Sequence, residues 1–320
     1  MTVTVVGSVA FDSLETPFGK RDKILGGAAT HSALAASFFT DVRVVGVVGS
    51  DFGDAELAVF EGREVNTDDL ERNEDERSFF WAGKYEHDMQ IAQTLDTQLN
   101  VFAHFDPVLS PAARESSVVF LANIQPDVQR RVCEQCPAAV TTGLDSMNYW
   151  ISSARDSLLE TMKAVDVVLL NDAELRMLTR ESNLPLAARQ IRQLGPPVVV
   201  AKLGSYGVAV FTDDGFFFVP GFPLESVVDP TGAGDSFAGG FFGYLDCQTA
   251  GEQDDDVLRA AAVYGSVMAS FQIEAFGSER LADVGHRDIE RRFREFRRMT
   301  HFEAQPNLAR ARARAARAPA

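Results

Sequence analysis

The sequence predicts an α/β protein in which helices cover both faces of a mostly parallel central sheet, with a small β lid beside it. Three observations predict this class. Short Val-rich runs alternate along the chain with segments of helical periodicity. A polar residue or a glycine follows most of these runs. Residues 76–105 interrupt the alternation with an aromatic and polar segment of period two.

The expected elements follow in chain order. The first strand, helix and strand lie in "TVTVVGSVAFD", "GGAATHSALAASFF" and "DVRVVGVVGSDFG". Further strands are expected in "SSVVFLANI", "AAVTTGLD", "AVDVVLLND", "PPVVVAKLG" and "YGVAVFT", with helices in "NYWISSARDSLLETMK" and "AELRMLTRESNLPLAARQIRQL". In such sheets the site gathers where parallel strands end. The residues that follow the apolar runs are Asp12, Asp51, Asn123, Asp145, Asn171 and Gly204.

The interrupting segment predicts the lid. Residues 76–105 read as antiparallel strands that protrude from the main sheet, with a contribution from residues 12–24. No internal repeat or low-complexity linker divides the rest, so residues 1–303 are expected to form one domain. The Arg- and Ala-rich residues 304–320 have no packing pattern, and we expect them to be disordered.

Composition limits the class of protein. The 320 residues are 46% hydrophobic, which is enough for a large core, and carry a net charge of −16. That charge argues against a nucleic-acid partner. The chain has no run of about 18 apolar residues and its start lacks a basic signal region, which predicts a cytoplasmic protein without a membrane partner. Three cysteines make no disulfide framework, and Cys133 and Cys136 are expected at a helix end.

The stretch "VVDPTGAGDSFAGGFFGYL", residues 227–245, predicts an anion site. Gly232 and Gly234 let a backbone approach a ligand closely, and free N–H groups at a helix start favour a phosphate. The pattern is not a P-loop, because no Gly-Lys-Ser/Thr follows. Asp235 beside such a site would serve to take a proton from a hydroxyl group. The alternative is a glycine-rich turn that Asp235 caps.

The segment "DPTGAGDSFAGGF" closely resembles the C-terminal signature of the ribokinase or PfkB family of carbohydrate and nucleoside kinases. The segments "GGAATHSALAA", "VVGSDFG", "NDAE" and "KLGSYGVAVF" resemble further family landmarks in the same order. Together they span residues 5–277. The resemblance implies a ribokinase-like three-layer α/β/α fold with a small β lid. It also implies that residues 1–303 form a kinase domain.

The resemblance implies the catalytic residues. Asp235 would be the base that deprotonates the acceptor hydroxyl, and the amides of Gly232, Ala233 and Gly234 would form the anion hole for the transferred phosphoryl group. Catalysis would then rest on positioning and on neutralising charge, as phosphoryl transfer requires.

The resemblance also implies two cation sites. Asn171 and Glu174 match the motif that organises Mg²⁺ and the phosphates, with Glu174 binding the ion through water. The same letters are typical of a helix N-cap with an acidic first turn. Asp229 and Thr231 fall where many members bind a monovalent cation such as K⁺.

The nucleotide, expected to be ATP, would lie along Lys202, Gly204 and Gly207 and against Phe276 and Gly277. Lys202 would either reach a phosphate or pair with a neighbouring acid. Phe276 and Gly277 would wall the adenine. An ADP-dependent donor is the alternative.

The acceptor side is implied by the N-terminal segments. Asp12 matches the acid that holds sugar hydroxyls in the family, and Gly26 and Gly27 would let the next helix start beneath the sugar. His31 stands where family members commonly carry Asn, which leaves both a substrate contact and a core histidine open. Trp81 in the lid would stack on the acceptor or pack within the lid or a dimer interface.

The same alternatives hold for Tyr85 in the lid, and such aromatic residues suit a base as well as a sugar. We therefore expect an ATP-dependent kinase that phosphorylates a hydroxyl of a sugar, with a nucleoside kinase of the adenosine or cytidine type as the alternative. A ligand-sensing regulator without turnover is a further alternative. The resemblance also suggests a homodimer formed through the lid.

Overall fold

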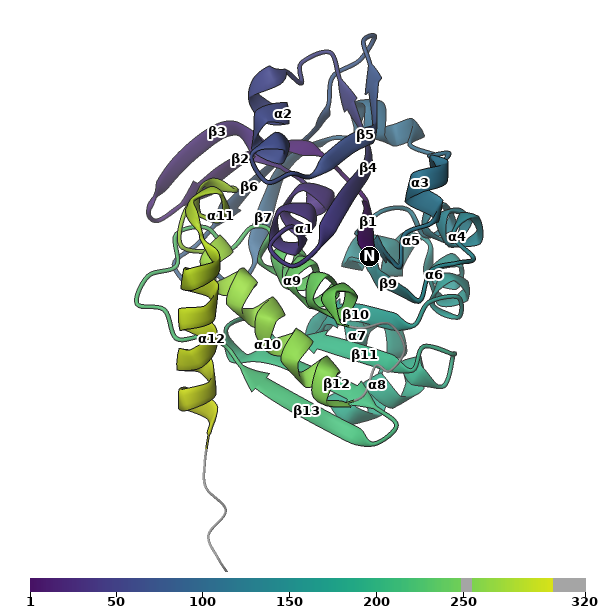
Figure 1. The fold of residues 1–320 in the computed structure, drawn as a ribbon, viewed down its shortest axis with the longest axis vertical. Helices are drawn as coiled ribbons and strands as arrows, with labels where there is room; N and C mark the ends of the chain where they lie inside the picture. The colour runs from purple at the N-terminus through teal and green to yellow at the C-terminus, as the bar shows by residue number, and fades with distance from the viewer. Residues whose placement is uncertain (249–254, 302–320) are drawn as a thin grey trace, which may run out of the picture.

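The computed structural model describes residues 1–248 and 255–301 of the chain. The strands of its larger sheet are β1 (Thr2–Val6), β4 (Asp41–Gly49), β5 (Asn66–Asn73), β8 (Val118–Leu121), β9 (Thr141–Asp145), β10 (Val167–Asn171), β11 (Val198–Lys202), β12 (Gly207–Thr212) and β13 (Gly215–Pro220). These nine strands lie in the order β13-β12-β11-β10-β9-β8-β1-β4-β5 (Figure 1). Neighbours are parallel from β5 to β11, and β12 and β13 are antiparallel. The expected mostly parallel sheet is thereby confirmed.

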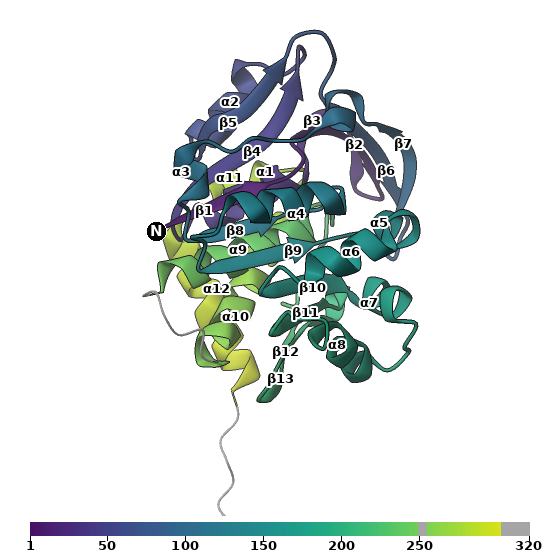
Figure 2. The same ribbon diagram turned by 90° about the vertical axis from the view of Figure 1, so that its right-hand side faces the viewer.

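Alternate residues of the strands enter two separate cores. In β10, for example, Val167 and Leu169 face one core, and Val168 and Leu170 face the other. This is why the strands are apolar throughout, as expected for a sheet buried on both faces. Figures 1 and 2 show the resulting three layers.

Helices cover both faces of this sheet. One core includes residues of α1 (Ala28–Ala36), α9 (Ala233–Cys247), α10 (Asp255–Gln272) and α12 (His286–Thr300). The other includes residues of α4 (Pro126–Gln135), α6 (Arg155–Met162), α7 (Asp172–Thr179) and α8 (Leu184–Arg192). The remaining helices are α2 (Asp54–Glu61), α3 (Pro111–Arg114), α5 (Asn148–Ser153) and α11 (Glu279–Asp283), with the 3₁₀ turns η1 (Asn100–His104) and η2 (Gly204–Tyr206).

A second sheet of four strands forms the lid, which lies at the upper left of Figure 1. Its strands are β2 (Ala10–Thr16), β3 (Gly19–Gly26), β6 (Phe79–Tyr85) and β7 (Ala92–Gln98). They lie in the order β3-β2-β6-β7. The central pair, β2 and β6, is parallel, although only antiparallel pairing was expected here. The end of the expected lid segment also differs, because residues 100–104 form η1 and no strand.

No helix within residues 1–248 and 255–301 is long and apolar enough to cross a membrane. The expected disordered tail, residues 304–320, lies outside the described residues.

Candidate active site

The glycine-rich stretch forms the turn that leads into α9. The helix begins at Ala233, and Gly232 before it has φ +74° and ψ 3°. The amide of Ala233 donates to the carbonyl of Pro230, 3.2 Å away. In the part of the chain that the structure describes, the amides of Gly232 and Gly234 have no such backbone partner. These two N–H groups at the positive end of a long helix are therefore free for an anion, whereas that of Ala233 is engaged.

Asp235 lies in the first turn of α9 and is partly exposed. Burial raises the pKa of Asp235, and the positive charge of Lys202 opposes this effect. A carboxylate whose pKa is raised accepts a proton more readily at neutral pH. The position and the pKa shift of Asp235 both suit a general base beside an anion site.

Lys202 provides a positive charge at the same place. It ends β11, and its ammonium group bonds to the carboxylate of Asp145 at the end of β9. Burial alone would lower the pKa of Lys202, but the carboxylates of Asp145 and Glu174 outweigh burial and raise it. The Lys202 Nζ atom would lie 3.3 Å from a Cβ atom on Gly234. The lysine therefore pairs with an acid, one of the two expected partners. It also lies against residues 230–234, which we call the anion-binding turn after the role that the sequence predicts for them.

Asn171 and Glu174 form a reciprocal cap at the start of α7. The Asn171 side chain accepts from the amide of Glu174 at 2.8 Å, and the Glu174 carboxylate accepts from the amide of Asn171 at 2.7 Å. This is a capping box. Burial raises the pKa of Glu174 to about 7, with Lys202 opposing and Asp145 adding to the shift. The negative charge of Glu174 is thus only partly compensated by its neighbours, which suits a site that receives a cation.

The side chains around Glu174 provide only some of the ligands that a magnesium ion needs. Within residues 1–248 and 255–301, no group of three or more His, Cys, Asp or Glu side chains converges as metal ligands. Mg²⁺ usually keeps several waters and takes one or two carboxylates together with substrate phosphates. Glu174 can supply one such carboxylate through water, as the resemblance implies.

Asp12 lies buried on β2 against the start of α1. A Cβ atom on Gly26 would lie 2.0 Å from the Asp12 Oδ2 atom, so only glycine fits there. Gly27 has φ +97°, and a Cβ atom on it would lie 2.4 Å from the carbonyl of Ser8. Burial raises the pKa of Asp12 to about 7, helped by the charges of Asp229 and Asp235. The two glycines thus let the start of α1 lie close to the Asp12 carboxylate, and their expected place beneath the sugar stays a prediction.

The lid places two aromatic residues beside Asp12. The register of β2 and β6 pairs Asp12 with Trp81, and strand alternation puts Trp81 and Tyr85 on one face. Trp81 lies over Gly83, where a Cβ atom would be 2.1 Å from the indole ring. The Thr231 hydroxyl donates to the Tyr85 hydroxyl oxygen at 3.3 Å. Tyr85 therefore connects the lid to the turn before α9.

His31 lies in α1 beneath the anion-binding turn. A Cβ atom on Gly232 would lie 2.5 Å from the imidazole ring. His31 is only 1% exposed, and neither ring nitrogen has a hydrogen-bond partner among the described residues. Burial lowers the pKa of His31, with the charge of Asp229 opposing. The imidazole is thus a core side chain by burial, yet it is unsatisfied and adjoins the site.

Asp229 and Thr231, the residues expected at a monovalent cation, lie together in the structure, where hydrogen bonds from the chain itself reach their oxygen atoms. Asp229 is fully buried, and its two carboxylate oxygens accept from the amides of Thr231 and Gly277, each at 2.9 Å. The carbonyl of Thr231 accepts from the side-chain amide of Gln272 at 3.0 Å. Each of these three oxygens thus already accepts a hydrogen bond from the chain itself.

The two glycines expected at the nucleotide, Gly204 and Gly207, have positive φ angles. Gly204 has φ +57° and Gly207 has φ +109°, and a Cβ atom on Gly207 would lie 2.0 Å from the carbonyl of Val219. The lid reaches this turn, because the Gln90 side-chain amide donates to the Ser205 hydroxyl at 3.4 Å. The turn that follows Lys202 is thus close to the tip of the lid.

Phe276 and Gly277 contact the lid. Phe276 is buried under the guanidinium group of Arg21 on β3, 4.7 Å from the ring centre. A Cβ atom on Gly277 would lie 2.9 Å from Ile24 of the same strand. Their expected role at the adenine stays a prediction.

Sequence reasoning missed two residues of this site. The sequence marks Asp145 only as a polar residue after an apolar run, and this position at a strand end is the signal for its role. The sequence predicts no role for Gln272, because a single glutamine at the end of an apolar helix forms no pattern. Each of the two residues forms a hydrogen bond with a residue that is more than 35 positions away in the chain.

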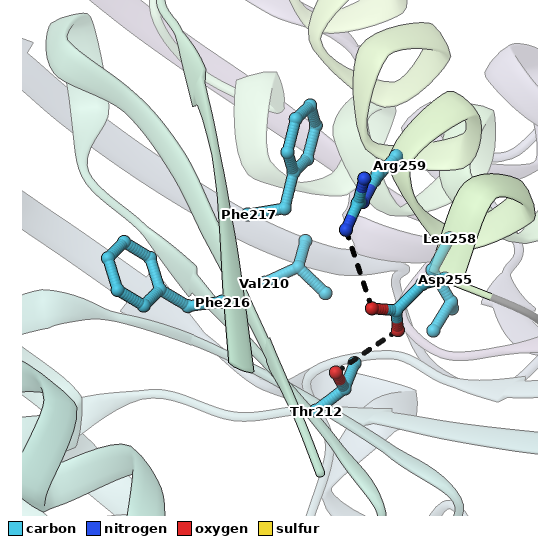
Figure 3. Close-up of a pocket in the computed structure, with 7 residues that line it drawn as sticks. All are labelled: Val210, Thr212, Phe216, Phe217, Asp255, Leu258 and Arg259. Carbon is cyan, nitrogen blue, oxygen red and sulfur yellow. Dashed lines mark hydrogen bonds and ion pairs between the residues drawn. The ribbon is translucent and has the colours of Figure 1, made fainter. Parts of the chain in front are cut away.

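A separate small pocket lies between β12, β13 and α10 and does not include any of these residues (Figure 3). Its polar groups satisfy one another, since Asp255 accepts from the Thr212 hydroxyl at 3.1 Å and pairs with Arg259 at 3.5 Å. Its apolar lining comes from Val210, Phe216, Phe217 and Leu258. This pocket carries none of the chemistry expected at the site.

Comparison with known proteins gives the family of the chain. The model of the pfkB family carbohydrate kinases matches residues 5–279. A cytidine kinase of Thermococcus kodakarensis is 28% identical over 253 residues, which cover 75% of this chain and 87% of that protein. A nucleoside kinase of Methanothermobacter thermautotrophicus is 27% identical over 305 residues, which cover 88% of this chain and 92% of that protein.

A solved structure shows the same fold. The fructokinase of Vibrio cholerae, crystallised with fructose, ADP and a calcium ion, superposes with a TM-score of 0.76 at 19% identity. The match covers 91% of this chain and 98% of the fructokinase.

Proposed function

The chain belongs to the pfkB family of carbohydrate kinases and is a phosphotransferase with an alcohol group as acceptor, and we propose that its acceptor is the ribose of a nucleoside. The observation that carries this proposal is the pair of relatives named cytidine kinase and nucleoside kinase, which align over most of the chain. A nucleoside carries a sugar hydroxyl, which is the phosphoryl acceptor that the sequence predicts, and it also carries a base.

The lid supports a nucleoside acceptor. Trp81 is the neighbour of Asp12 across β2 and β6, so a carboxylate for ribose hydroxyls lies next to an aromatic ring for a base. A free sugar is the second candidate, because Asp12 would hold hydroxyls equally well without the base.

The proposed chemistry follows from the residues around α9. Asp235 takes the proton of the acceptor hydroxyl as that oxygen attacks the γ-phosphoryl group of ATP. The amides of Gly232 and Gly234 and the ammonium group of Lys202 face the transferred group and neutralise its charge. Gly204 and Gly207 let the nucleotide approach the turn after β11.

Glu174, through water, would hold a Mg²⁺ ion bound to the phosphates of ATP, and that ion would neutralise charge on the phosphates. Asn171 orients Glu174 through the capping box. Glu174 has one carboxylate oxygen on the Asn171 amide, so its second oxygen is the candidate for water and the ion.

The test is an activity panel. ATP consumption is measured with Mg²⁺ for pyrimidine and purine nucleosides, free sugars and sugar phosphates, with ADP as an alternative donor. We expect turnover on a nucleoside and a loss of about 100-fold to 10,000-fold in Asp235→Asn, as for a general base. Turnover on free sugars alone would select the second candidate.

Asp246→Asn is the matched control for the base. Asp246 is a buried carboxylate of the same helix, and it accepts from the hydroxyls of Thr40 and Ser117. We expect Asp246→Asn to lower stability while kcat stays within a few-fold of the parent value. Binding of ATP without phosphorylation of any acceptor would favour a ligand-sensing regulator.

We also propose a homodimer formed through the lid. Ile91, beside the edge strand β7, is 79% exposed, and Leu95 in β7 is 56% exposed. An exposed edge strand with apolar side chains favours pairing with another chain. Sedimentation of the protein and of Leu95→Lys tests this, and a monomeric parent protein would refute it.

A further inference from the structure

The turn before α9 is held by one buried glutamine. Gln272 is the last residue of α10 and is fully buried. Its Nε2 atom lies 3.0 Å from the carbonyl oxygen of Thr231 and 2.6 Å from that of Gly277. Two carbonyl oxygens converge on this nitrogen, so both hydrogens of the amide group are used.

The carboxylate of Asp229 lies between the same two segments. One of its oxygens accepts from the amide of Thr231 and the other from the amide of Gly277, each at 2.9 Å. In the part of the chain that the structure describes, no Lys, Arg or His pairs with Asp229 within 4.0 Å. Backbone amides therefore provide its hydrogen-bond compensation.

Converging carbonyl oxygens beside a buried carboxylate are the ligands that a monovalent cation takes in place of water. Here the same lone pairs point at an amide nitrogen. An N–H donor and a cation cannot both occupy that point, because each must lie within contact distance of the same oxygens. The arrangement thus disagrees with the monovalent cation that the family resemblance implies.

The contact to Thr231 acts directly on the anion-binding turn. The Thr231 carbonyl and the Gly232 amide belong to one planar trans peptide, so their C=O and N–H bonds point in opposite directions. A donor fixed on the carbonyl therefore directs the Gly232 N–H away from Gln272. It also polarises the peptide and strengthens that N–H as a donor.

We propose that Gln272 is a positioning residue whose side-chain amide replaces a monovalent cation, so that the anion-binding turn is ordered without K⁺. This inference rests on the proposed phosphotransfer for its effect on rate. Its effect on stability does not depend on the identity of the acceptor.

The experiment compares the parent protein with Gln272→Ala, which removes the amide and opens its space. Melting temperature and kcat are measured in tetramethylammonium, sodium and potassium chloride at equal ionic strength. We expect the parent protein to show no K⁺-specific change in melting temperature and less than about a twofold change in kcat. We expect Gln272→Ala to lose at least about tenfold in kcat without K⁺, and K⁺ to restore both readouts.

Gln129→Ala is the matched control. Gln129 is also fully buried, and its amide donates to the carbonyls of Leu121, Ala122 and Asp145. The carboxylate next to these carbonyls is that of Asp145, and it is already paired with the cation of Lys202. Gln129→Ala should lower the melting temperature without any K⁺-specific recovery.

Gln272→Glu is the second variant, in case the alanine variant does not fold. It keeps the shape of the side chain but replaces the donor with an oxygen, so its melting temperature should rise specifically with K⁺. The proposal is overturned if the parent protein gains melting temperature or activity specifically from K⁺. It is also overturned if neither folded Gln272 variant responds to K⁺. If no acceptor is phosphorylated at all, the proposed function fails, and the melting data still decide this inference.

Discussion

The ammonium group of Lys202 is bonded to the carboxylate of Asp145 across an intervening strand. Lys202 ends β11 and Asp145 ends β9, and β10 lies between them. The pair is buried, with 18% of the lysine side chain and 4% of the aspartate side chain exposed. Its position at the carboxyl ends of the strands places a fixed cation beside the turn that opens α9.

We predict that Lys202→Met lowers both activity and stability. Loss of the cation leaves Asp145 buried without a partner, which costs about 3–5 kcal/mol of unfolding free energy. Loss of its charge at the transferred group should lower kcat about 100-fold to 1,000-fold. Urea unfolding and steady-state kinetics measure the two effects.

The double variant Lys202→Met/Asp145→Leu separates these effects. It removes both charges, so most of the lost stability should return while kcat stays low. Recovery of kcat in the double variant would mean that Lys202 serves only to compensate Asp145.

The raised pKa of Asp12 predicts how stability depends on pH. The pKa of this carboxyl rises from its ordinary value of 3.8 to about 7 in the folded protein. Well below pH 3.8 the carboxyl is protonated in both states, so it does not change the free energy of unfolding. Between these pKa values the unfolded chain has released its proton and the folded protein has not, so stability falls as pH rises and then stays low above about pH 7.

Asp12→Asn should remove the part of this dependence that Asp12 contributes, while Glu174, whose pKa is also raised to about 7, keeps its own part. At pH 8 it should stabilise the protein by up to about 4 kcal/mol, and at pH 4 it should have little effect. It should also raise KM for the acceptor at least about tenfold. Urea unfolding at both pH values tests the first effect, with the exposed Asp22→Asn as control. A parallel shift at both pH values would contradict the assignment to Asp12.

Gly232→Ala should disturb the anion-binding turn for two reasons. A side chain at φ +74° costs about 1–2 kcal/mol, and the new Cβ atom would lie 2.5 Å from the ring of His31. We expect a loss of at least about tenfold in kcat together with lower stability.

His31→Ala tests the second reason. If the ring contact matters, the double variant should be at least about 1 kcal/mol more stable than the sum of the two single changes predicts. Additive effects would instead show that backbone conformation alone requires glycine.

Tyr85→Phe should weaken acceptor binding. The change removes the hydroxyl that accepts from Thr231, a contact between the lid and the turn before α9. Loss of one such bond costs about 1 kcal/mol, or about fivefold in KM, while kcat should change less. Thr231→Val should have the same effect, and the double variant should add little to either. A larger effect on kcat than on KM would point to a role in the chemical step.

The strands that are buried on both faces of the sheet could be predicted from the sequence. Strands such as β10 and β11 are continuous apolar runs because both of their faces are covered, and such runs are easily recognised. The edge strand β5, "NTDDLERN", was missed because none of its residues is fully buried and it carries only one large apolar residue, Leu70. The edge strand β13 was missed as well, since half of its residues are exposed.

The candidate site divides in the same way. Residues within one motif, such as Asn171 and Glu174, could be identified together because their hydrogen bonds are local. The family resemblance that supplied their roles is confirmed by the match over residues 5–279. The Lys202–Asp145 pair and the contacts of Gln272 could not be foreseen, because they join segments that only the folded chain brings together.

The contact between the lid and the turn after β11 should link the binding of the two proposed substrates thermodynamically. Gln90 at its tip donates to Ser205, so the strands that cover the acceptor also touch the turn on the nucleotide side. If one substrate stabilises the closed lid, the other substrate binds to a lid that is already closed. Its binding then no longer includes the free energy of closing the lid. Thermodynamic linkage requires each substrate to change the affinity for the other by the same factor. The more strongly the acceptor favours the closed lid, the more tightly the nucleotide should bind.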